Sequence, residues 1–508
     1  MTKKIRVRFA PSPTGAIHIG NVRAAVFNWL FAKKMDGNFI LRMEDTDTAR
    51  STKEAEEGIV KELSWLGISF DEGPDVGGDF GPYRQSERTS IYNEYLNKLV
   101  SSKKAYRCYC SKEELEEERT VQVQKSLMPS YSGKCRALTH EQEKAFIAEG
   151  KKPVVRLLIE PKRVNFYDII KGEISYDSGS LGGDFVIQRG NGEFVYNFTV
   201  VIDDAVMKIS HVIRGEDHLT NTIKQLLLYK ALEIKPPEFA HCPLILGEDG
   251  KKLSKRFLTE SLAMSREEAG NLAVDLVLQA RFLTDSLAMF RADGILPDAL
   301  INYTALLGWS SRSGTEIFSK EELISKFELK NVSSSPSTFS YDKLKWVNGE
   351  HIKKMDVETF CATLFEYLKK YCNSFNVADI DKEKFFEFAK IIKESLVILK
   401  DSMSYIDMFF RPDGALSAGA LDIINTNDAK NVIKSFIEFL EEEPSLDKQS
   451  YQNITNRVKD KLNIKGKGLF MPLRAAITRD VTGPQLDDFC AFLGKESVIK
   501  RVNDALHS

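Results

Sequence analysis

The loop PSPTGAIHIG at residues 11–20 constrains the fold more than any other stretch of the sequence. It follows an apolar strand predicted over residues 5–9 and precedes an amphipathic helix predicted over residues 21–33. Its prolines fix φ and its glycines permit positive φ, so the chain turns sharply between strand and helix. Backbone N–H groups and the dipole at such a helix start attract anions, and His18 lies where an anion would bind. The loop therefore predicts a phosphate site, with an ordinary surface turn as the alternative.

The whole chain has the composition of a globular protein with several domains. It has 508 residues, 43% hydrophobic and 28% charged, and a formal net charge of −2. A near-neutral chain can still carry a local basic face, so composition neither indicates nor excludes nucleic-acid binding. No apolar run reaches membrane-spanning length, no signal peptide precedes the first strand, and the seven cysteines are scattered. We therefore expect a reduced, cytoplasmic protein without membrane association.

Two further predicted strands end in acidic residues. The strand at residues 39–43 runs into the sequence EDTD, and a strand predicted at residues 194–202 runs into Asp203 and Asp204. Acidic residues at the carboxyl ends of strands in an open α/β sheet face its ligand crevice. Between these strands, residues 105–194 alternate charge-rich helical stretches with short β-like runs, which indicates an inserted α/β subdomain.

The sequence changes character in its second half. Beyond Pro297 nearly every segment has helical periodicity, and the longest single helix is predicted over residues 382–410. This change predicts a separate helical part, with a boundary near residues 310–338. An internal repeat lies before it: RFLTESLAM begins at residue 256 and RFLTDSLAM at residue 281, 25 residues later. Two copies are too few for a solenoid, so a local duplication is the simplest account.

A second motif, KLSKR at residues 252–256, carries the charge needed to neutralise a polyphosphate. It places three cations in five residues on a loop after a short predicted strand. A basic loop alone is usually just solvated. Together with PSPTGAIHIG more than two hundred residues upstream, however, it resembles the "HIGH" and "KMSKS" signature pair of class I aminoacyl-tRNA synthetases.

Further segments narrow the resemblance to the glutamyl-tRNA synthetase family. They occur in order and almost from end to end of the chain. The segments are RFAPSPTG (8–15), RMEDTD (42–47), DEGP (71–74), GPYRQS (81–86), VIDD (201–204), VIRGEDH (212–218), NYTALLGW (302–309), KLKWVNG (343–349) and PLRAAIT (472–478).

The resemblance implies an α/β Rossmann-type catalytic domain with an inserted α/β subdomain, followed by an all-α anticodon-binding region of the bacterial type. Glutaminyl enzymes carry β-barrels in place of the helical region, which argues against that rival. The implied parts are residues 1–104, the first half of the Rossmann fold; 105–194, the inserted subdomain that binds the acceptor stem; 195–320, the second half with the signature loop and the 25-residue insert; 321–380, a helical stem-contact region; and 381–508, the anticodon-binding domain.

The reaction implied by the family has two steps. The α-carboxylate of L-glutamate attacks the α-phosphate of ATP, and the glutamyl group then passes to the 2′-OH of the terminal adenosine of tRNA-Glu. His18, Lys252 and Lys255 are the predicted catalytic residues, because cations and donors there stabilise charge on the phosphates. The residues implied to bind ATP, which arrives with Mg²⁺, are His18, Gly20, Asn21, Lys252, Ser254 and Lys255.

Glutamate has two carboxylates and one ammonium group, so its site needs two cations and one anion. The family match assigns Arg8 and Tyr196 to the γ-carboxylate, Arg214 to the α-carboxylate, and Glu44 with Ser12 to the ammonium group. Ala10 completes this predicted set. The alternative for Arg8 and Glu44 is that they merely pair with each other across neighbouring strands.

Three cysteines raise the question of a structural zinc ion in the inserted subdomain. Some relatives bind zinc through Cys-x-Cys, a third Cys and a following His; here Cys108, Cys110 and Cys135 match, but Ala137 stands at the His position. Tyr131 could supply a phenolate as the fourth ligand, as in a paralogous tRNA-modifying enzyme. Three reduced cysteines without a metal are the alternative.

Several alternatives stay open at this stage. In relatives that reject tRNA-Gln, an arginine lies near the start of a long helix in the last quarter of the chain, where this sequence has Ser395. Charging of tRNA-Gln is therefore an alternative to tRNA-Glu alone. A cytidylyltransferase-type enzyme would lack the long helical half, a non-catalytic paralogue would lose His18 or Lys252, and a tRNA-modifying paralogue would stop near residue 300. We expect a monomer.

Overall fold

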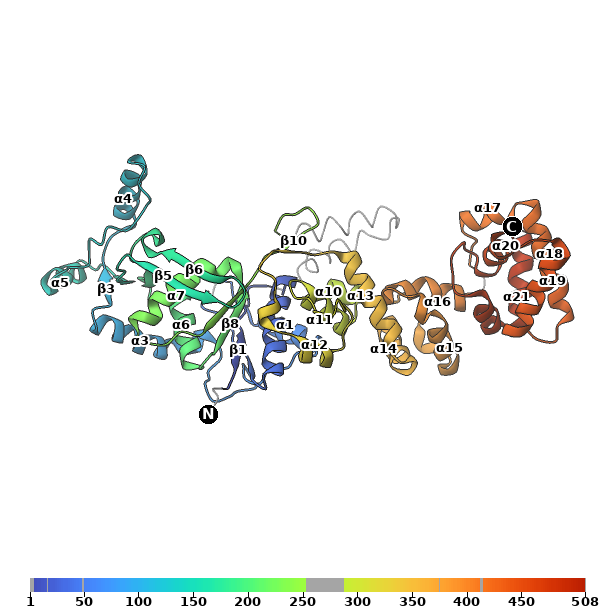
Figure 1. The fold of residues 1–508 in the computed structure, drawn as a ribbon, viewed down its shortest axis with the longest axis horizontal. Coiled ribbons are helices and arrows are strands. Elements are labelled where there is room, and N and C mark those ends of the chain that lie inside the picture. The colour runs from blue at the N-terminus through green and yellow to red at the C-terminus, as the bar shows by residue number, and fades with distance from the viewer. Residues whose placement is uncertain are drawn as a thin grey trace. The chain divides into compact units, whose positions relative to one another are not determined.

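The computed structural model describes residues 4–15, 17–47, 50–252, 287–373, 375–411 and 414–507 (Figure 1). The chain forms two compact units, the first comprising Met1–Met289 with Leu300–Tyr341 and the second Phe290–Ala299 with Asp342–Ser508. The five-part division drawn from the sequence is finer than these units and stays a prediction. Among the helices in the described ranges, none is long and apolar enough to cross a bilayer.

The first unit contains the sheet on which the predicted site is built. Strand β1 (Arg6–Phe9) pairs in parallel with β2 (Asn38–Leu41), and β8 (His211–Gly215) pairs in parallel with β9 (Glu238–Cys242). The backbone N–H of Ser210 donates to the carbonyl of Arg6 at 2.9 Å, which puts β1 beside β8. These strands are mostly buried, as expected for parallel strands covered by helices.

Two strands from the predicted insert extend this sheet. β5 (Arg163–Asp168) bridges in parallel to β9, where Asp168 lies opposite Phe239, and β6 (Gly172–Asp177) pairs antiparallel with β5. The order β6-β5-β9-β8 therefore joins strands that the sequence assigned to different parts. The remaining strands of the insert are β3 (Ala105–Cys108), β4 (Val154–Leu157) and β7 (Val186–Gln188), which form a separate antiparallel sheet.

Capping residues start most of the helices of the first unit where the sequence places them. Helix α1 (Ile19–Lys34) begins after His18, and α2 (Lys53–Trp65) begins after Thr52, whose hydroxyl accepts from the N–H of Ala55. In the insert, α4 (Lys112–Gln124) and α5 (His140–Ala148) each start with a capping box. The other elements here are α3 (Thr89–Ser101), α7 (Leu219–Ala231), α12 (Lys320–Lys326), β10 (Ile245–Leu246) and β11 (Ser337–Thr338).

The strand predicted at residues 194–202 is wrong, because this segment forms helix α6 (Tyr196–Val206). Every residue from Asn197 to Asp204 is buried in the helix. A helix that is apolar nearly all round shows no 3.6-residue alternation, so its sequence reads as a buried strand. Asp203 and Asp204 consequently project from a helix instead of ending a strand.

The second unit is helical, as the sequence predicted. The single helix expected over residues 382–410 is wrong in its length: α15 (Lys382–Ile392) ends, and α16 (Ser402–Phe410) starts anew. The carboxylate of Asp401 accepts from the N–H groups of Val397 and Ile398 at 3.2 and 3.0 Å, so local bonds replace helical ones there. The other helices are α14 (Val357–Tyr371), α17 (Ala418–Ile424), α18 (Asn427–Glu442), α19 (Lys448–Leu462), α20 (Lys467–Thr478) and α21 (Leu486–Leu506), while α10 (Ala288–Asp293), α11 (Pro297–Leu306) and α13 (Tyr341–Lys354) contain residues of both units.

Candidate active site

His18 caps the start of α1 and orients its own ring in doing so. Its Nδ1 accepts from the backbone N–H groups of Gly20 and Asn21, at 3.1 and 3.4 Å. Because Nδ1 is an acceptor, the ring proton of the neutral form sits on Nε2. The exposed ring thus presents an N–H donor at a helix N-terminus, which is the arrangement an anion requires. A Cβ at Gly20 would lie 3.0 Å from His18 Nδ1, so a larger residue there would crowd the ring.

Arg8 is held by a carboxylate that the sequence did not assign to it. Its Nε and Nη2 donate to Asp204 at 3.1 and 3.4 Å, and both side chains are buried. Arg42 donates to the same Asp204 through Nη1 at 2.6 Å and to Glu44 through Nη2 at 3.1 Å. Arg8 therefore pairs with Asp204 and Glu44 with Arg42, which overturns the alternative of a direct pair between Arg8 and Glu44.

Burial and ion pairing compete at these carboxylates. Burial opposes ionisation of Asp204, but the charges of Arg8 and Arg42 outweigh it, so the pKa of Asp204 lies below its ordinary value. At Glu44 burial wins over Arg42 and Arg8, and its pKa is raised. Next to them, Arg88 Nε donates to Asp203 at 2.6 Å, and Tyr92 donates to it at 2.9 Å. Two neighbouring carboxylates on α6 thus anchor three arginines. Asp204 binds Arg8 of β1 and Arg42 after β2, and Asp203 binds Arg88 before α3.

Arg214 differs from Arg8 in having only neutral partners. It donates through Nη2 to Thr222 at 2.7 Å and Gln225 at 2.8 Å, and through Nε to His241 at 3.3 Å. The side chain is buried, and no carboxylate of the described residues lies within ion-pairing distance of it. Its Nη1 is buried and meets no hydrogen-bond partner in the described part of the chain. A buried cation with a vacant donor is a site for an anionic ligand.

Tyr196 lies among these charged groups at the start of α6. Burial and the charge of Glu44 raise the pKa of Tyr196 to about 12, while Arg214 and Arg8 act in the opposite direction. Its hydroxyl lies 3.4 Å from His218 Nδ1. The structure therefore brings Arg8, Glu44, Tyr196 and Arg214 into one electrostatic environment.

The loop before α1 carries Ala10 and Ser12 to the same region. The backbone N–H of Glu44 donates to the carbonyl of Pro11 at 3.0 Å, which sets the loop beside the segment that follows β2. Ala10 is half-buried and Ser12 is exposed. The residues predicted for the ammonium group of glutamate, Ser12 and Glu44, thus lie on adjacent backbone segments.

The signature loop is described only at its start. Lys252 is exposed, and its Nζ lies 3.8 Å from the carboxylate of Asp217, two residues beyond the end of β8. Lys252 also forms an isolated antiparallel bridge with Leu246. The predictions for Ser254 and Lys255, and both copies of the repeat up to residue 286, lie outside the described residues.

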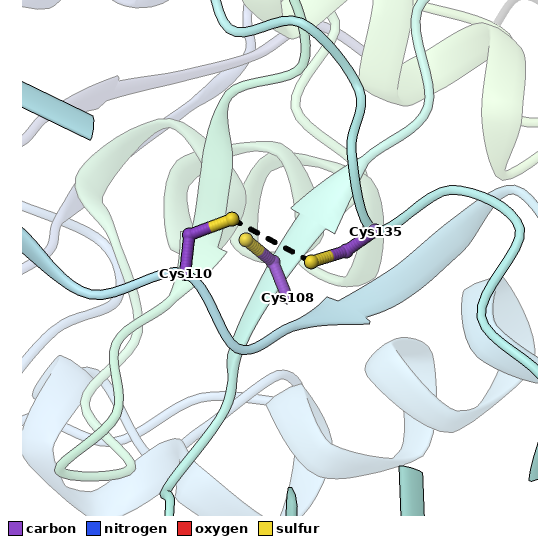
Figure 2. A group of neighbouring side chains, drawn as sticks. All are labelled: Cys108, Cys110 and Cys135. Atoms are coloured by element: carbon purple, nitrogen blue, oxygen red, sulfur yellow. Dashed lines mark hydrogen bonds between the residues drawn. The ribbon is translucent and has the colours of Figure 1, made fainter. Parts of the chain in front are cut away.

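The three cysteines of the insert come together as a metal site requires. Figure 2 shows the side chains of Cys108, Cys110 and Cys135 converging from separate segments. Their sulfur atoms lie within 4.8 Å of one another, with 3.6 Å between Cys110 and Cys135. Zinc–sulfur bonds of about 2.3 Å in a tetrahedron place sulfur atoms about 3.8 Å apart. The spacing of the three thiols therefore fits a zinc ion.

Tyr131 stands at the fourth corner of this set. Its hydroxyl lies 3.4 Å from Cys108 Sγ and 3.8 Å from Cys110 Sγ. Burial and the charge on Cys108 raise the pKa of the Cys110 thiol to about 12, which means that ionisation of Cys110 conflicts with its burial and with the charge beside it. A divalent cation would remove that conflict, which is the usual coupling between thiolate ionisation and metal binding.

A pocket of about 610 Å³ lies in the second unit, between α19, α20 and the start of α21. Its lining combines aromatic rings, amides and an arginine. The lining residues are Tyr451, Gln452, Thr455, Asn456, Phe470, Arg474, Gln485, Leu486 and Asp487. Phe470 is 44% exposed, and Arg474 is oriented by donating through Nη1 to the carbonyl of Pro484 at 2.9 Å. Stacking surfaces beside base-edge donors and acceptors suit an unstacked nucleobase.

Two family descriptions together match most of the chain. Residues 4–280 and 277–346 match "tRNA synthetases class I (E and Q), catalytic domain", and residues 360–506 match "Anticodon binding domain". Similar curated proteins cover nearly the whole length. A glutamate–tRNA ligase 1 of Thermoanaerobacter sp. strain X514 is 44% identical, with 99% of each chain aligned, and a glutamate–tRNA ligase of Bacillus subtilis strain 168 is 40% identical, with 99% of this chain and all of the relative aligned.

A solved structure agrees with these matches. The crystal structure of a glutamate tRNA ligase from Elizabethkingia meningosepticum, in complex with its amino acid, has a TM-score of 0.85 and 31% identity over the full length of both chains. The chain belongs to the glutamate–tRNA ligases. This membership confirms the family and the fold class predicted from the sequence motifs. The two segments that match the synthetase catalytic domain meet at residues 277–280, just before the second copy of the repeat.

Several polar residues around the site of this glutamate–tRNA ligase were not found by sequence reasoning. Asp204 was seen at the end of a segment but not paired with Arg8, because 196 residues separate them. Arg42 lies inside the recognised motif RMEDTD and Arg88 lies two residues beyond GPYRQS, but neither was given a role. Asp168 and His241, which lie behind Arg214, carried no local signal, since each is a single polar residue in a short strand.

The buried pairs of Asp204 generate a prediction for stability. Asp204→Asn is expected to lower the free energy of unfolding by about 3 kcal/mol, because two buried guanidinium groups lose their shared charge partner. Since the pKa of Asp204 is depressed on folding, its stabilisation is complete above the unfolded-state pKa and is lost as pH falls through the folded-state value. The difference between variant and wild type should therefore shrink in acid.

Denaturant titration of both proteins across acid and neutral pH measures this effect. Glu94→Gln is the matched control, because it breaks an exposed pair with Lys98 and should leave the unfolding midpoint unchanged. Equal midpoints for Asp204→Asn and wild type at neutral pH would contradict the prediction.

Proposed function

We propose that this protein joins L-glutamate to tRNA-Glu with ATP, through a glutamyl-adenylate, and forms the ester on the 2′-OH of the terminal adenosine. One observation of the structure carries the proposal: Arg214 is a buried cation whose Nη1 has no partner in the described residues and whose other partners are neutral. A substrate carboxylate would supply the missing charge and acceptor together. The names of the relatives point to the same amino acid.

The chain's residues can divide the recognition of glutamate among them. Arg214 would receive the α-carboxylate at Nη1, and Arg8 with Tyr196 the γ-carboxylate. Asp204 takes two of the guanidinium nitrogens of Arg8, which fixes the direction of the third. Glu44, with Ser12 on the adjacent segment, would accept from the ammonium group. Fixing these groups in advance lowers the entropy lost when the reacting carboxylate is aligned with ATP.

The other substrate of the first step would lie across the start of α1. The His18 Nε2–H and the N-terminus of α1 would face the phosphates, and Gly20 and Asn21 would border them. Lys252 and Lys255 would stabilise the charge on the pyrophosphate as it leaves, and Ser254 would bind ATP beside them. Among the described residues only the cysteine set gathers three metal-ligand side chains, so Mg²⁺ is expected to arrive on the ATP phosphates. Its chemistry there is to neutralise phosphate charge.

The charging reaction itself is the first test. Purified protein is expected to attach glutamate to transcribed tRNA-Glu, because the similar curated proteins are glutamate–tRNA ligases. A parallel assay with transcribed tRNA-Gln measures whether the specificity extends to that tRNA. The names of these relatives do not favour the alternative that the chain is a glutaminyl-tRNA synthetase. His18→Ala should slow charging by about 100-fold or more, because one donor to the phosphates is lost.

Acid-gel separation of charged and free tRNA measures these rates. His211→Gln is the matched control, since His211 contacts Ser210 and Glu238 and not the loop before α1. Failure to charge tRNA-Glu would overturn the proposal. Glutamate on tRNA-Gln at a comparable rate would restore the broader specificity that Ser395 suggested.

We also propose that the thiol set and Tyr131 hold a structural zinc ion. The supporting observations are the three sulfur atoms within 4.8 Å of one another, with 3.6 Å between those of Cys110 and Cys135, and the Tyr131 hydroxyl beside them. When bound, the ion would stabilise the link between β3 and the loop that carries Cys135. No step of the reaction passes through it.

Metal analysis tests the site without reference to activity. The purified protein is expected to carry about one zinc per chain by mass spectrometry, Cys135→Ser to carry almost none, and Tyr131→Phe to lose it to a chelator at least tenfold faster. Cys361→Ser, outside the set, is the matched control and should keep its zinc. A metal-free wild-type protein purified without chelator would refute the site.

We propose further that the pocket of the second unit receives a base of the tRNA anticodon. It lies inside the segment matched to the anticodon-binding family, and it offers Phe470 for stacking beside Arg474. We also propose that the protein is a cytoplasmic monomer. Light scattering of the purified chain would check the monomeric state.

Loss of the stacking ring has a specific expected signature. Phe470→Ala should raise the KM for tRNA about tenfold, because stacking one base on an aromatic ring is worth about 1–3 kcal/mol. The KM values for glutamate and ATP should stay unchanged. Met35→Ala, an exposed apolar residue of the first unit, is the matched control. An unchanged KM for tRNA in Phe470→Ala would exclude this role for the pocket.

A further inference from the structure

A chain of buried hydrogen bonds lies behind Arg214 and reaches into the predicted insert. Asp168, the last residue of β5, accepts from His241 Nδ1 at 2.6 Å, and His241 Nε2 faces Arg214 Nε at 3.3 Å. Asp168 and His241 are both fully buried. The described contacts make neither of them a ligand of substrate, so their role must pass through Arg214.

The hydrogen bonds fix which ring nitrogen of His241 carries the proton. A guanidinium N–H can only donate, so the Nε2 that faces Arg214 Nε must be the unprotonated acceptor. The proton then lies on Nδ1, from which it is donated to Asp168. Thr222 is compatible with this arrangement, because its hydroxyl lies 2.8 Å from Nε2 and can donate to it while accepting from Arg214 Nη2.

The backbone in turn fixes Asp168. Its Oδ1 accepts from the N–H groups of Ile170 and Lys171, both at 2.9 Å, and the N–H of His241 lies 3.2 and 3.1 Å from the two carboxylate oxygens. Oδ2 is thereby left facing the ring of His241. An acceptor at this one position is what holds the proton on Nδ1.

We propose that Asp168 and His241 are positioning residues that fix the tautomer behind Arg214 and so hold its vacant Nη1 toward the substrate carboxylate. This inference rests on the proposed function, in which Arg214 binds the substrate carboxylate. The groups that face His241 are Asp168 from β5, Arg214 from β8, and, at longer range, Arg8 from β1 and His218 after β8. Burial, with Arg214 and Arg8, lowers the pKa of His241 and keeps the ring neutral.

The turn after β5 makes a second contact with the segment that follows Arg214. Lys171 forms an ion pair with Glu216, whose carboxylate accepts from the backbone N–H of Leu244 at 2.8 Å. Asp168 therefore holds the side chain of Arg214 through His241, and Lys171 holds Glu216, the first residue after β8. A strand of the predicted insert thus determines the geometry of the proposed amino-acid site.

The decisive variant is Asp168→Asn, which keeps the shape of the side chain. Its amide oxygen would take the backbone donors at the Oδ1 position and turn its NH₂ group toward Nδ1. The ring would then have to carry its proton on Nε2, where it meets the N–H of Arg214. We expect the KM for glutamate to rise about tenfold or more, the loss expected for a hydrogen bond to a charged group, while the KM for ATP changes less than about twofold.

Two readouts separate positioning from a general structural effect. Selective ¹⁵N labelling of the seven histidines, with His241→Gln to assign the signal, should show the proton on Nδ1 in wild type and on Nε2 in Asp168→Asn. His241→Gln can keep an acceptor oxygen near the Nε2 position, so it should raise the KM for glutamate less than His241→Leu does. Adding Asp168→Asn to His241→Gln should cost little more, because no tautomer remains to be fixed.

The matched control is Asp184→Asn, a buried carboxylate of the insert that binds Arg136 and Tyr106 and does not contact His241. It should leave the KM for glutamate unchanged. A wild-type protein that does not charge glutamate would defeat the proposed function, while the tautomer measurement would still decide the hydrogen-bond chain. Two results would overturn the inference. One is a wild-type protein that charges tRNA but carries the His241 proton on Nε2, and the other is an unchanged KM for glutamate in Asp168→Asn. If Asp168→Asn does not fold, equal KM values for His241→Gln and His241→Leu would overturn it.

Discussion

Two arginines from different segments share one buried carboxylate, and this interaction fixes where the amino-acid site can form. Asp204 on α6 binds Arg8 of β1 and Arg42 of the segment after β2. Removing three charges from water costs free energy that their attraction only partly returns, so such a group is a poor source of net stability. What it provides is position, since Arg8 cannot turn away without losing its own buried charge partner, Asp204. The helix and both strands must therefore be in place before the site exists.

Arg8 and Arg214 are both buried guanidinium groups, yet their surroundings prepare them for different roles. Arg8 is partly neutralised by Asp204, so it can contribute direction more than charge. Arg214 is surrounded by a hydroxyl, an amide and an imidazole, so its charge remains uncompensated at short range. Burial lowers the pKa of Arg214, but an arginine guanidinium stays protonated in proteins, so the cation persists. Under the proposed function, a substrate anion would gain most from Arg214 and would be oriented by Arg8.

The sequence could predict those parts of the fold and site that depend on local signals. Prolines and glycines fix the turn before α1, and His18 caps that helix with its own ring, so this end of the site was visible in the sequence. Helix α6 was read as a strand, because eight consecutive buried positions conceal the helical period. The break before α16 depends on the side-chain bonds of Asp401. Asp168 and His241 lie 73 residues apart, and only the parallel register of β5 and β9 brings them together.

That register also changes what the inserted segment is. By sequence pattern it is a separate subdomain between two halves of one fold, and its antiparallel sheet of β3, β4 and β7 fits that description. β5, however, joins β9 in the main sheet, and its last residue is in contact with the ring behind Arg214. A displacement of β5 along β9 would move the acceptor away from His241 Nδ1 and release the constraint on Nε2. The register of β5 against β9 therefore belongs to the geometry of the proposed amino-acid site.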